Sequence, residues 1–306
     1  MRRILKWIGI VLGGLIGLLV LAVVGLLIYG QLSFKRTHAD WPLRPITADT
    51  SPEGLARGQY LMENVMGCDQ ACHSPQGTPF VGEYEEVNEG PISAVFAVPN
   101  LTPDQETGLG AWTDAQIARA IREGVDKDGV ELVIMPAQNY RALSDADVAT
   151  MVAYLRNLEP VRNEIPPFEV NAVGKVMLAL GMLGPKPSSQ PIPGPQNAPT
   201  PGTAEYGGYL VALGACRDCH GEVLSGGKIP FSPPDAPLVP NLTPAGDLSK
   251  WSEADFLKAM HNGVTPDGRT LDPEGMPWPS YGRMTDADLG AIFKYLQTLP
   301  PVESEQ

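Results

Sequence analysis

Two short stretches decide how this chain is organised: Cys216-Arg217-Asp218-Cys219-His220 and Cys68-Asp69-Gln70-Ala71-Cys72-His73. Together they contain all four cysteines of the 306-residue chain and two of its four histidines. In both stretches a histidine directly follows the second cysteine. The cysteines are separated by two residues in the first stretch and by three in the second. Two thiols and an imidazole so close together indicate one chemical site per stretch: a disulfide, a metal site or the attachment point of a cofactor.

The rest of the chain repeats itself around these stretches. Val98-Pro99-Asn100-Leu101-Thr102-Pro103 returns as Val239-Pro240-Asn241-Leu242-Thr243-Pro244, at an offset of 141 residues. Further pairs are Trp112 with Trp251, Gly124-Val125 with Gly263-Val264, Met135-Pro136 with Met276-Pro277, and Tyr154-Leu155 with Tyr295-Leu296. Each cysteine stretch leads its own copy, and two copies are too few for a solenoid. The sequence therefore predicts two tandem domains, 50–162 and 202–302, with a Pro-rich linker at 163–201.

Each copy carries helix signals and no convincing alternating strand. Thr113 and Gln116 have the spacing of a capping box, and the helix that they begin is expected to stop at Gly124. The second copy repeats this pattern from Ser252 to Gly263. Apolar residues at helical spacing predict a last helix in each copy, over 144–158 and 285–299. The expected fold is mainly α, with a few short helices and long loops in each domain.

The linker contains a helix signal of its own. Ile165-Pro166-Pro167 and the run from Pro185 to Pro201 predict stiff, extended chain. The apolar stretch 168–183 between them predicts a short helix. We expect this helix to lie along one domain or at the joint between the domains, in preference to the bilayer surface.

Residues 1–34 are expected to form a short cytoplasmic tip and a transmembrane anchor. Trp7 to Tyr29 is 23 residues long and has no charge. As a helix it would span about 34 Å, enough for a bilayer core of about 30 Å. A cleaved signal peptide is the alternative, but the apolar region of such a peptide usually has only about 7–15 residues. The basic residues Arg2, Arg3 and Lys6 favour an N-terminus inside the cell.

The charge balance limits the classes of partner. The formal net charge is −13. The first 34 residues contain three basic and no acidic residues, so the remainder has 19 basic residues against 35 acidic ones. An acidic surface disfavours nucleic acid, because phosphate contacts need Lys and Arg. It favours redox partner proteins that carry a basic patch.

Cys-x-x-Cys-His is the attachment signature of c-type haem. Two thiols must reach the two vinyl groups of one porphyrin, and the following imidazole must reach the iron. We therefore predict two haem c groups, held covalently by Cys68 and Cys72 and by Cys216 and Cys219. His73 and His220 are the predicted iron ligands. The stretch with three spacer residues is a variant site, and whether both thioethers form there stays open. A disulfide within each pair and a zinc site are the alternatives.

Met135 and Met276 are the predicted second iron ligands. They occupy equivalent positions before a proline, 62 residues after His73 and 56 after His220. A thioether opposite an imidazole suits an electron-transfer haem and raises its reduction potential. Methionine is also a common core filler, but the repeat favours ligation at these two positions.

On these motifs the chain resembles a duplicated class I cytochrome c fold. More specifically, it is similar to the membrane-bound cytochrome c subunits of bacterial periplasmic dehydrogenases for alcohols, aldehydes and sugar acids. The resemblance covers nearly all of 50–302. It rests on the Cys-His stretches, the Pro-Asn-Leu-Thr-Pro repeat, the stretch 107–113, the Gly-Val helix ends and the Met-Pro pairs. Those subunits usually carry three haem domains, whereas this chain has two.

The resemblance also implies roles for residues near the ligands. The carbonyls of Pro99 and Pro240 would hold the second nitrogen of the ligand imidazoles. Trp112 and Trp251 follow the Asn-Leu-Thr loops, where an indole N–H could donate to a haem propionate or the ring could simply fill the core. The two remaining histidines, at 38 and 261, have no equivalents in the other copy and are expected on the surface.

These features together imply electron transfer and not catalysis. Haem is attached outside the cytoplasm, so the haem domains are expected in the periplasm behind a single-pass anchor in the inner membrane. The expected partners are a donor, such as a dehydrogenase or another membrane-bound complex, and an acceptor of a respiratory or photosynthetic chain. A dihaem enzyme, such as a peroxidase or a thiosulfate-oxidising cytochrome, is the alternative. It would need an open coordination position on one iron. A haem sensor would need an output domain.

Overall fold

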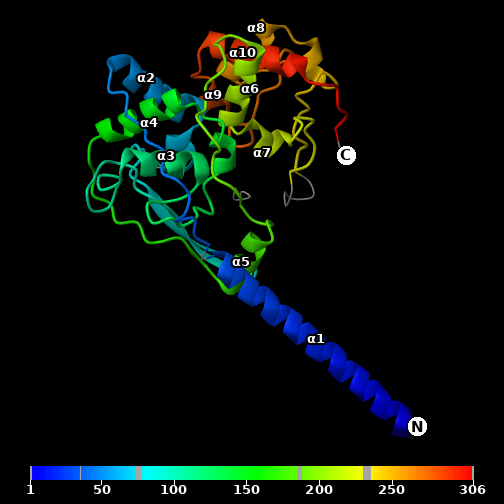
Figure 1. Ribbon diagram of the computed structural model, residues 1–306. Helices are drawn as coiled ribbons and strands as arrows, with labels where there is room; N and C mark the ends of the chain where they lie inside the picture. The colour runs from blue at the N-terminus through cyan, green and yellow to red at the C-terminus, as the bar shows by residue number, and fades with distance from the viewer. Residues whose placement is uncertain (1, 35, 74–76, 185–187, 230–235, 305–306) are drawn as a thin grey trace.

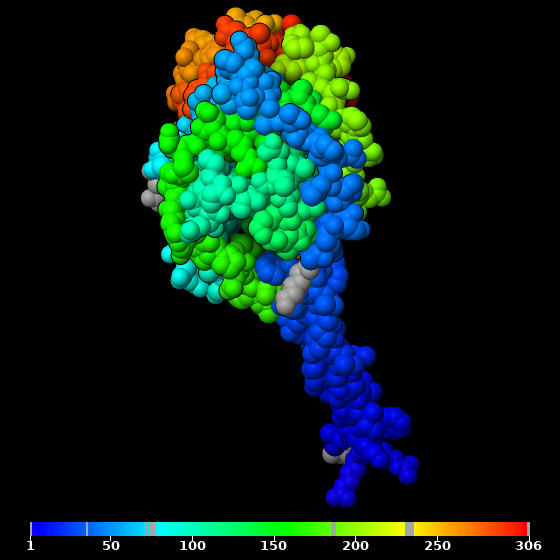
Figure 2. Space-filling model, turned by 60° about the vertical axis from the view of Figure 1, so that its left-hand side comes forward, coloured from blue at the N-terminus to red at the C-terminus, as the bar shows by residue number. Residues whose placement is uncertain are grey.

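The computed structural model describes residues 2–34, 36–73, 77–184, 188–229 and 236–304. Met1, Lys35 and Pro185, where the predicted Pro-rich run begins, lie outside these ranges. The long helix α1 (Arg2–Phe34) projects from a body of two helical domains (Figure 1). Within the described ranges it alone is long and apolar enough to cross a membrane. Figure 2 shows the first domain lying between α1 and the second domain.

The helices of the two domains follow the same order. The first domain contains α2 (Pro52–Tyr60), η1 (Leu61–Val65), η2 (Asp69–His73), α3 (Asp114–Glu123), η3 (Ala137–Tyr140) and α4 (Asp145–Asn157). The second contains α6 (Ala204–Leu213), α7 (Cys216–His220), η4 (Asp247–Lys250), α8 (Glu253–Asn262), α9 (Trp278–Tyr281) and α10 (Asp286–Thr298). In each domain the helix before the cysteine stretch packs against the last helix, α2 on α4 and α6 on α10.

The predicted helix caps are present. Thr113 and Gln116 form the capping box of α3, and α3 ends at Gly124, which has a left-handed φ of 65°. Ser252 and Asp255 cap α8 in the same way, with Gly263 at φ 66°. A glycine stops both helices because other L-residues rarely adopt this conformation. The apolar faces of the helices join in one core that runs through both domains. It includes Leu61, Ile117, Met151, Leu155, Leu210, Leu289 and Leu296.

The expectation that the chain contains no strand is wrong. β1 (Glu83–Glu89) and β2 (Ile92–Val98) form an antiparallel hairpin, and the short β3 (Glu169–Val170) pairs with β2. The sequence did not reveal β1 because it is an exposed edge strand with four glutamates, so it has no alternating apolar face. The hairpin lies between the first cysteine stretch and the Pro-Asn-Leu-Thr-Pro motif and reaches down to α5 (Figure 1).

The linker helix is present, but its expected position is wrong. α5 (Ala172–Ala179) packs mainly against the end of α1, with smaller contacts to β2 and β3. The reason is that Gly30 of α1 leaves room for Val176 to pack directly on the helix backbone. The later part of the linker lies along the first domain, where Asp145 N–H donates to Gln196 O (2.9 Å) and Ile192 N–H donates to Glu123 Oε1 (2.6 Å).

Candidate haem sites

The second cysteine stretch forms a single helical turn. α7 comprises Cys216–His220 and is preceded by Ala215, which adopts a left-handed φ of 52°. Burial raises the pKa of the Cys216 thiol to about 12 and also raises that of Cys219. Both thiols are free, as are those of Cys68 and Cys72, so the four cysteines form no disulfide. The turn thus holds both thiols and the imidazole within five residues.

The first cysteine stretch has one more spacer residue and forms a wider helical turn than the second. η2 (Asp69–His73) is π-helical, and a π turn holds one more residue per hydrogen-bonded loop than an α turn. The third spacer residue is therefore taken up within the turn. Gly67, at φ 61°, stands where Ala215 stands in the second domain. Both stretches thus begin with a left-handed residue and continue as one helical turn.

Each histidine of the two stretches is held from behind by a proline carbonyl. His73 Nδ1 lies 3.0 Å from Pro99 O, and His220 Nδ1 lies 2.9 Å from Pro240 O. A carbonyl only accepts, so Nδ1 donates and Nε2 keeps its lone pair. Burial lowers the pKa of His73 to about 4, and it also lowers the pKa of His220. Both imidazoles are neutral near pH 7 and present Nε2 as a ligand, which fits an iron porphyrin.

Two glycines missed by sequence analysis hold these proline loops in place. Gly82 N–H donates to His73 O (3.1 Å), and Gly226 N–H donates to His220 O (2.9 Å). Both have positive φ, and a Cβ atom at either would overlap the carbonyl oxygen of Val98 or Val239. Only glycine allows this close approach. The sequence contained a signal for them, because in each copy a glycine lies between the histidine and the Pro-Asn-Leu-Thr-Pro motif.

The Asn and Thr of the repeated motif act as a clamp. Asn100 Nδ2 donates to Val161 O (2.8 Å), and Thr102 Oγ1 accepts from Val161 N–H (3.1 Å). In the second domain, Asn241 and Thr243 bind Val302 in the same way, at 2.8 and 3.2 Å. These bonds fasten the proline loop to the chain that leaves the last helix. They explain why the motif recurs as a block.

The two predicted methionine ligands lie in equivalent loops. Pro136 and Pro277, which follow them, have nearly the same backbone conformation, φ −78° and ψ 52° against φ −74° and ψ 52°. Met135 packs partly buried against the core, and Met276 is half-buried. The short helices that follow carry Tyr140 and Tyr281, and the hydroxyl of Tyr281 donates to Gly214 O (2.8 Å), two residues before Cys216. In the second domain the helix after the methionine loop thus contacts the chain that leads into the cysteine turn.

The comparison with known proteins shows the family of the chain. The cytochrome c family matches residues 55–159 and 204–300, about two-thirds of the chain. The chain belongs to the cytochrome c family. In keeping with two matched regions, each with two thiols, an imidazole and a methionine, this cytochrome carries two haem c groups. Among the described residues, no three His, Cys, Asp or Glu side chains meet as a zinc site would require.

Several relatives of this cytochrome are named as cytochromes c or as cytochrome c subunits of dehydrogenases. It is 31% identical to a dihaem cytochrome c-type protein of Cereibacter sphaeroides over 294 residues, which cover 86% of this chain and 93% of that protein. It is 29% identical to the cytochrome c subunit of a quinone alcohol dehydrogenase of Gluconacetobacter polyoxogenes, over 85% of this chain and 59% of that subunit. For the gluconate 2-dehydrogenase cytochrome c subunit of Pantoea cypripedii the identity is 28%, over 92% and 65%. The chain thus spans about three-fifths of the length of the dehydrogenase subunits that it matches.

The remaining predicted residues of the cytochrome are placed as follows. Trp112 and Trp251 both pack partly buried against the core, and a contact to a propionate remains a prediction for both. His261 is partly exposed and lies 2.9 Å from Asp286. The expectation of a surface position is wrong for His38, which is 9% exposed and lies 3.3 Å from Glu131. The chain directly after α1 folds back against the first domain and buries this ring.

The two haem domains of the cytochrome meet in a seam with approximate two-fold symmetry. Tyr60 of the first domain donates to Asp288 of the second (2.6 Å) and accepts from Thr285 N–H (3.2 Å). Tyr209 of the second domain donates to Asp147 of the first (2.6 Å) and accepts from Ser144 N–H (3.1 Å). Each tyrosine therefore binds the beginning of the last helix of the other domain.

The same symmetry brings the cysteine turns into the seam. Asn139, just after Met135 and Pro136, donates to Asp218 of the second cysteine stretch (2.8 Å). In return Ser280, just after Met276 and Pro277, donates to Gln70 of the first stretch (3.0 Å). Each attachment turn thus touches the helix that follows the predicted methionine ligand of the other domain.

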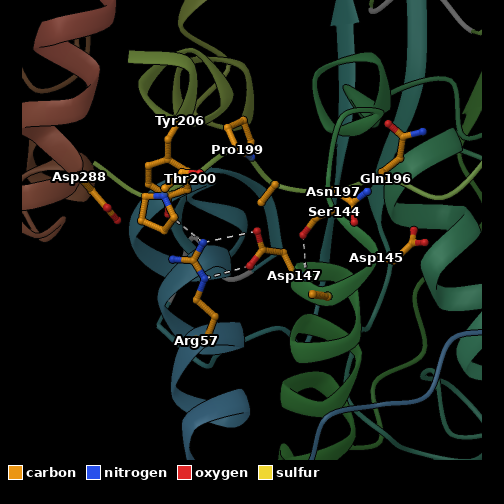
Figure 3. Close-up of a pocket in the computed structure, with 13 residues that line it drawn as sticks. Arg57, Ser144, Asp145, Asp147, Gln196, Asn197, Pro199, Thr200, Tyr206 and Asp288 are labelled. Carbon is orange, nitrogen blue, oxygen red and sulfur yellow. Dashed lines mark hydrogen bonds and ion pairs between the residues drawn. The ribbon is translucent and has the colours of Figure 1, made fainter. Parts of the chain in front are cut away.

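A pocket of about 740 Å³ lies beside the seam and is lined partly by the linker residues 196–201 (Figure 3). At its base Arg57 forms an ion pair with Asp147 (3.0 Å) and donates to Tyr206 (3.1 Å). The ion pair lies within the first domain, and the bond from Arg57 to Tyr206 crosses to the second domain. We therefore assign the pocket a structural part in holding the seam.

Proposed function

We propose that this cytochrome carries electrons, on the non-cytoplasmic side of a membrane, from a donor such as a dehydrogenase to an acceptor of a respiratory or photosynthetic chain. The observation that carries the proposal is the seam. Both attachment turns are hydrogen-bonded to the other domain, at Asp218 and at Gln70. Two redox sites that share one interface are suited to exchanging electrons within the chain.

The proposed ligand set assigns one task to each residue. Cys68 and Cys72 in the first domain, and Cys216 and Cys219 in the second, would form the thioethers. His73 with Met135 would hold the iron of the first haem, and His220 with Met276 that of the second. Pro99 and Pro240 orient the imidazoles through the Nδ1 bonds. Haem supplies the one-electron chemistry, and the chain supplies burial, orientation and ligand identity.

We further propose that α1 anchors the cytochrome as a single-pass helix in the inner membrane. Trp7 and Tyr29 flank its uncharged stretch, as aromatic residues do at the two faces of a bilayer. The basic residues precede the helix, which favours an N-terminus inside the cell. The haem domains then lie in the periplasm, where haem is attached and where an acidic surface meets basic redox partners.

The test uses the full-length protein purified in a mild detergent. We expect mass spectrometry to find two covalent haems, and the ferric spectrum to be low-spin for both. We also expect the electrons from a sub-stoichiometric pulse of reductant to distribute between the two haems of one molecule before two molecules can collide. A single haem would rule out attachment at 68–73. A high-spin ferric signal would instead favour the dihaem enzyme, because that signal requires an open iron position.

A further inference from the structure

We infer that the tip of the linker, residues 180–182 directly after α5, is a second membrane contact that sits in the lipid headgroup layer beside α1. The inference rests on the proposed insertion of α1 and concerns a different segment of the chain. Figure 1 shows α5 lying against the end of α1 that is nearest to the first domain. The contacts between the two helices show how deep the tip lies relative to the bilayer that α1 is proposed to span.

These contacts show in which direction α5 runs along α1. Lys175 Nζ donates to Gln31 Oε1 (3.0 Å) and lies over the ring of Phe34. One residue later, Val176 packs on the backbone at Gly30. At the end of α5, Ala179 O accepts from the hydroxyl of Tyr29 (3.5 Å). Later residues of α5 therefore meet earlier residues of α1, so α5 runs back toward the bilayer.

The level of Tyr29 sets the depth of the tip. Tyr29 ends the uncharged stretch of α1, and tyrosine is enriched where the hydrocarbon core meets the headgroups. Ala179 is therefore at this boundary. Leu180 follows it, and the chain then turns at Gly181, so that Met182 N–H donates to Met177 O (2.9 Å). The side chains of Leu180 and Met182 are 51% and 41% exposed in the protein alone, and the tip carries no charge. Apolar side chains at this depth, unburied by protein, are suited to contact with lipid acyl chains.

The tip is not a loose loop, because its far end returns to the first haem domain. A Cβ atom at Gly184 would lie 3.1 Å from the carbonyl oxygen of Val133, two residues before Met135. The chain leaving α1 reaches the same loop from the other side, where His38 N–H donates to Gly129 O (2.6 Å). The membrane contact therefore supports the loop that carries the predicted methionine ligand of the first domain.

The experiment measures how quickly introduced cysteines react with a water-soluble maleimide. The protein without an added cysteine is labelled in parallel, and any reaction of a native thiol that haem attachment leaves free is subtracted. The full chain is reconstituted in phosphatidylethanolamine–phosphatidylglycerol vesicles, in four variants: L180C, M182C, L21C in the middle of α1, and V223C in the second domain. Val223 is 52% exposed and so matches Leu180. The haem content of each variant serves as the folding control.

We expect L180C and M182C to react at least tenfold more slowly than V223C, and L21C not to react. If L21C is protected but L180C and M182C react as fast as V223C, the tip lies in water and the inference is overturned, while the anchor stands. If L21C reacts too, α1 does not insert, and the membrane part of the proposed function fails. The protein is also diluted with additional lipid. If L180C and M182C then lose their protection, a second copy of the chain had covered the tip, and the inference of a lipid contact is overturned.

Discussion

The two haem domains agree in the residues that hold a cofactor and differ in the loops that lead to the methionines. In the first domain the loop is Leu132-Val133-Ile134-Met135, apolar and half-buried. In the second domain it is two residues longer, Leu271-Asp272-Pro273-Glu274-Gly275-Met276, and residues 272–275 between its two ends are exposed. Duplication has therefore preserved the inward-facing chemistry while each copy adapted its outer surface to its own surroundings.

The difference matches the position of each domain. The first domain lies next to α1, and its methionine loop is covered by the chain after α1 and by the end of the linker helix segment. The second domain lies away from α1, and its loop meets solvent with two carboxylates. Burial and nearby negative charge act on a haem potential in opposite directions, because carboxylates stabilise the more positive oxidised iron. In the first domain burial raises the pKa of the Cys72 thiol, and the negative charge of Glu83 raises it further.

The largest expected effect comes from exchanging the two predicted methionine ligands. M276H and M135H should each lower the potential of the haem in their own domain by on the order of 100 mV or more, since axial ligands set haem potentials over roughly 0.8 V. The other haem should be nearly unaffected. A spectroelectrochemical titration of each variant, resolved into two one-electron steps, measures both potentials. M284L, at a buried core methionine without a ligand role, is the control. A potential that does not move removes that methionine from the ligand set.

The repeat is also the reason why so much of this site was predictable. The cysteines, histidines, prolines and methionines are each supported twice, and the caps of α3 and α8 are local patterns that depend only on nearby residues. The β1–β2 hairpin could not be predicted, because an exposed edge strand does not need an apolar face. The burial of His38 and the position of α5 depend on contacts with distant parts of the chain, and no local periodicity encodes such contacts.

The seam was missed for a similar reason, although the repeat contained its signal. Tyr60 and Asp288 are 228 residues apart, so only the relative placement of the domains makes them neighbours. The tyrosine recurs at 209 and the aspartate at 147, which identifies both pairs in retrospect. A residue that recurs in both copies but has no contact partner in its own domain can bind the other domain.

The second prediction compares the two halves of the seam. Y209F should destabilise the chain by about 2 kcal/mol, because it removes a hydrogen bond to a buried carboxylate and leaves Ser144 N–H without an acceptor. Y60F should cost about 1 kcal/mol, since Thr285 is exposed and water replaces the lost hydroxyl there. Reversible denaturant unfolding of the holoprotein measures both. The exposed Tyr84 supplies the control Y84F, which should stay within about 0.5 kcal/mol. Equal losses of unfolding free energy in Y209F and Y60F would show that the two halves of the seam do not differ in stability because of burial.

The third prediction compares the residues that open the two cysteine turns. Ala215 and Gly67 have almost the same left-handed φ, 52° and 61°. A left-handed conformation costs a non-glycine residue roughly 1 kcal/mol, so A215G should stabilise the protein by up to about 1 kcal/mol and G67A should destabilise it by about as much. Thermal unfolding monitored at the haem absorption band measures both changes. Changes of the same sign in the two variants would mean that the two turns do not share this strain.

The smallest expected effect concerns the acidic methionine loop of the second domain. The double variant D272N/E274Q removes two exposed carboxylates, so the potential of the second haem should rise by on the order of 10 mV, the scale of water-screened charges. The rise should vanish in about 1 M salt, where the Debye length falls to about 3 Å. E83Q in the first domain should raise the first potential instead, because the negative charge of Glu83 acts on the first cysteine stretch, where it helps to raise the pKa of Cys72. If D272N/E274Q moves the first potential as much as the second, these carboxylates act on the molecule as a whole. The contrast between the two loops would then have no consequence for the individual haems.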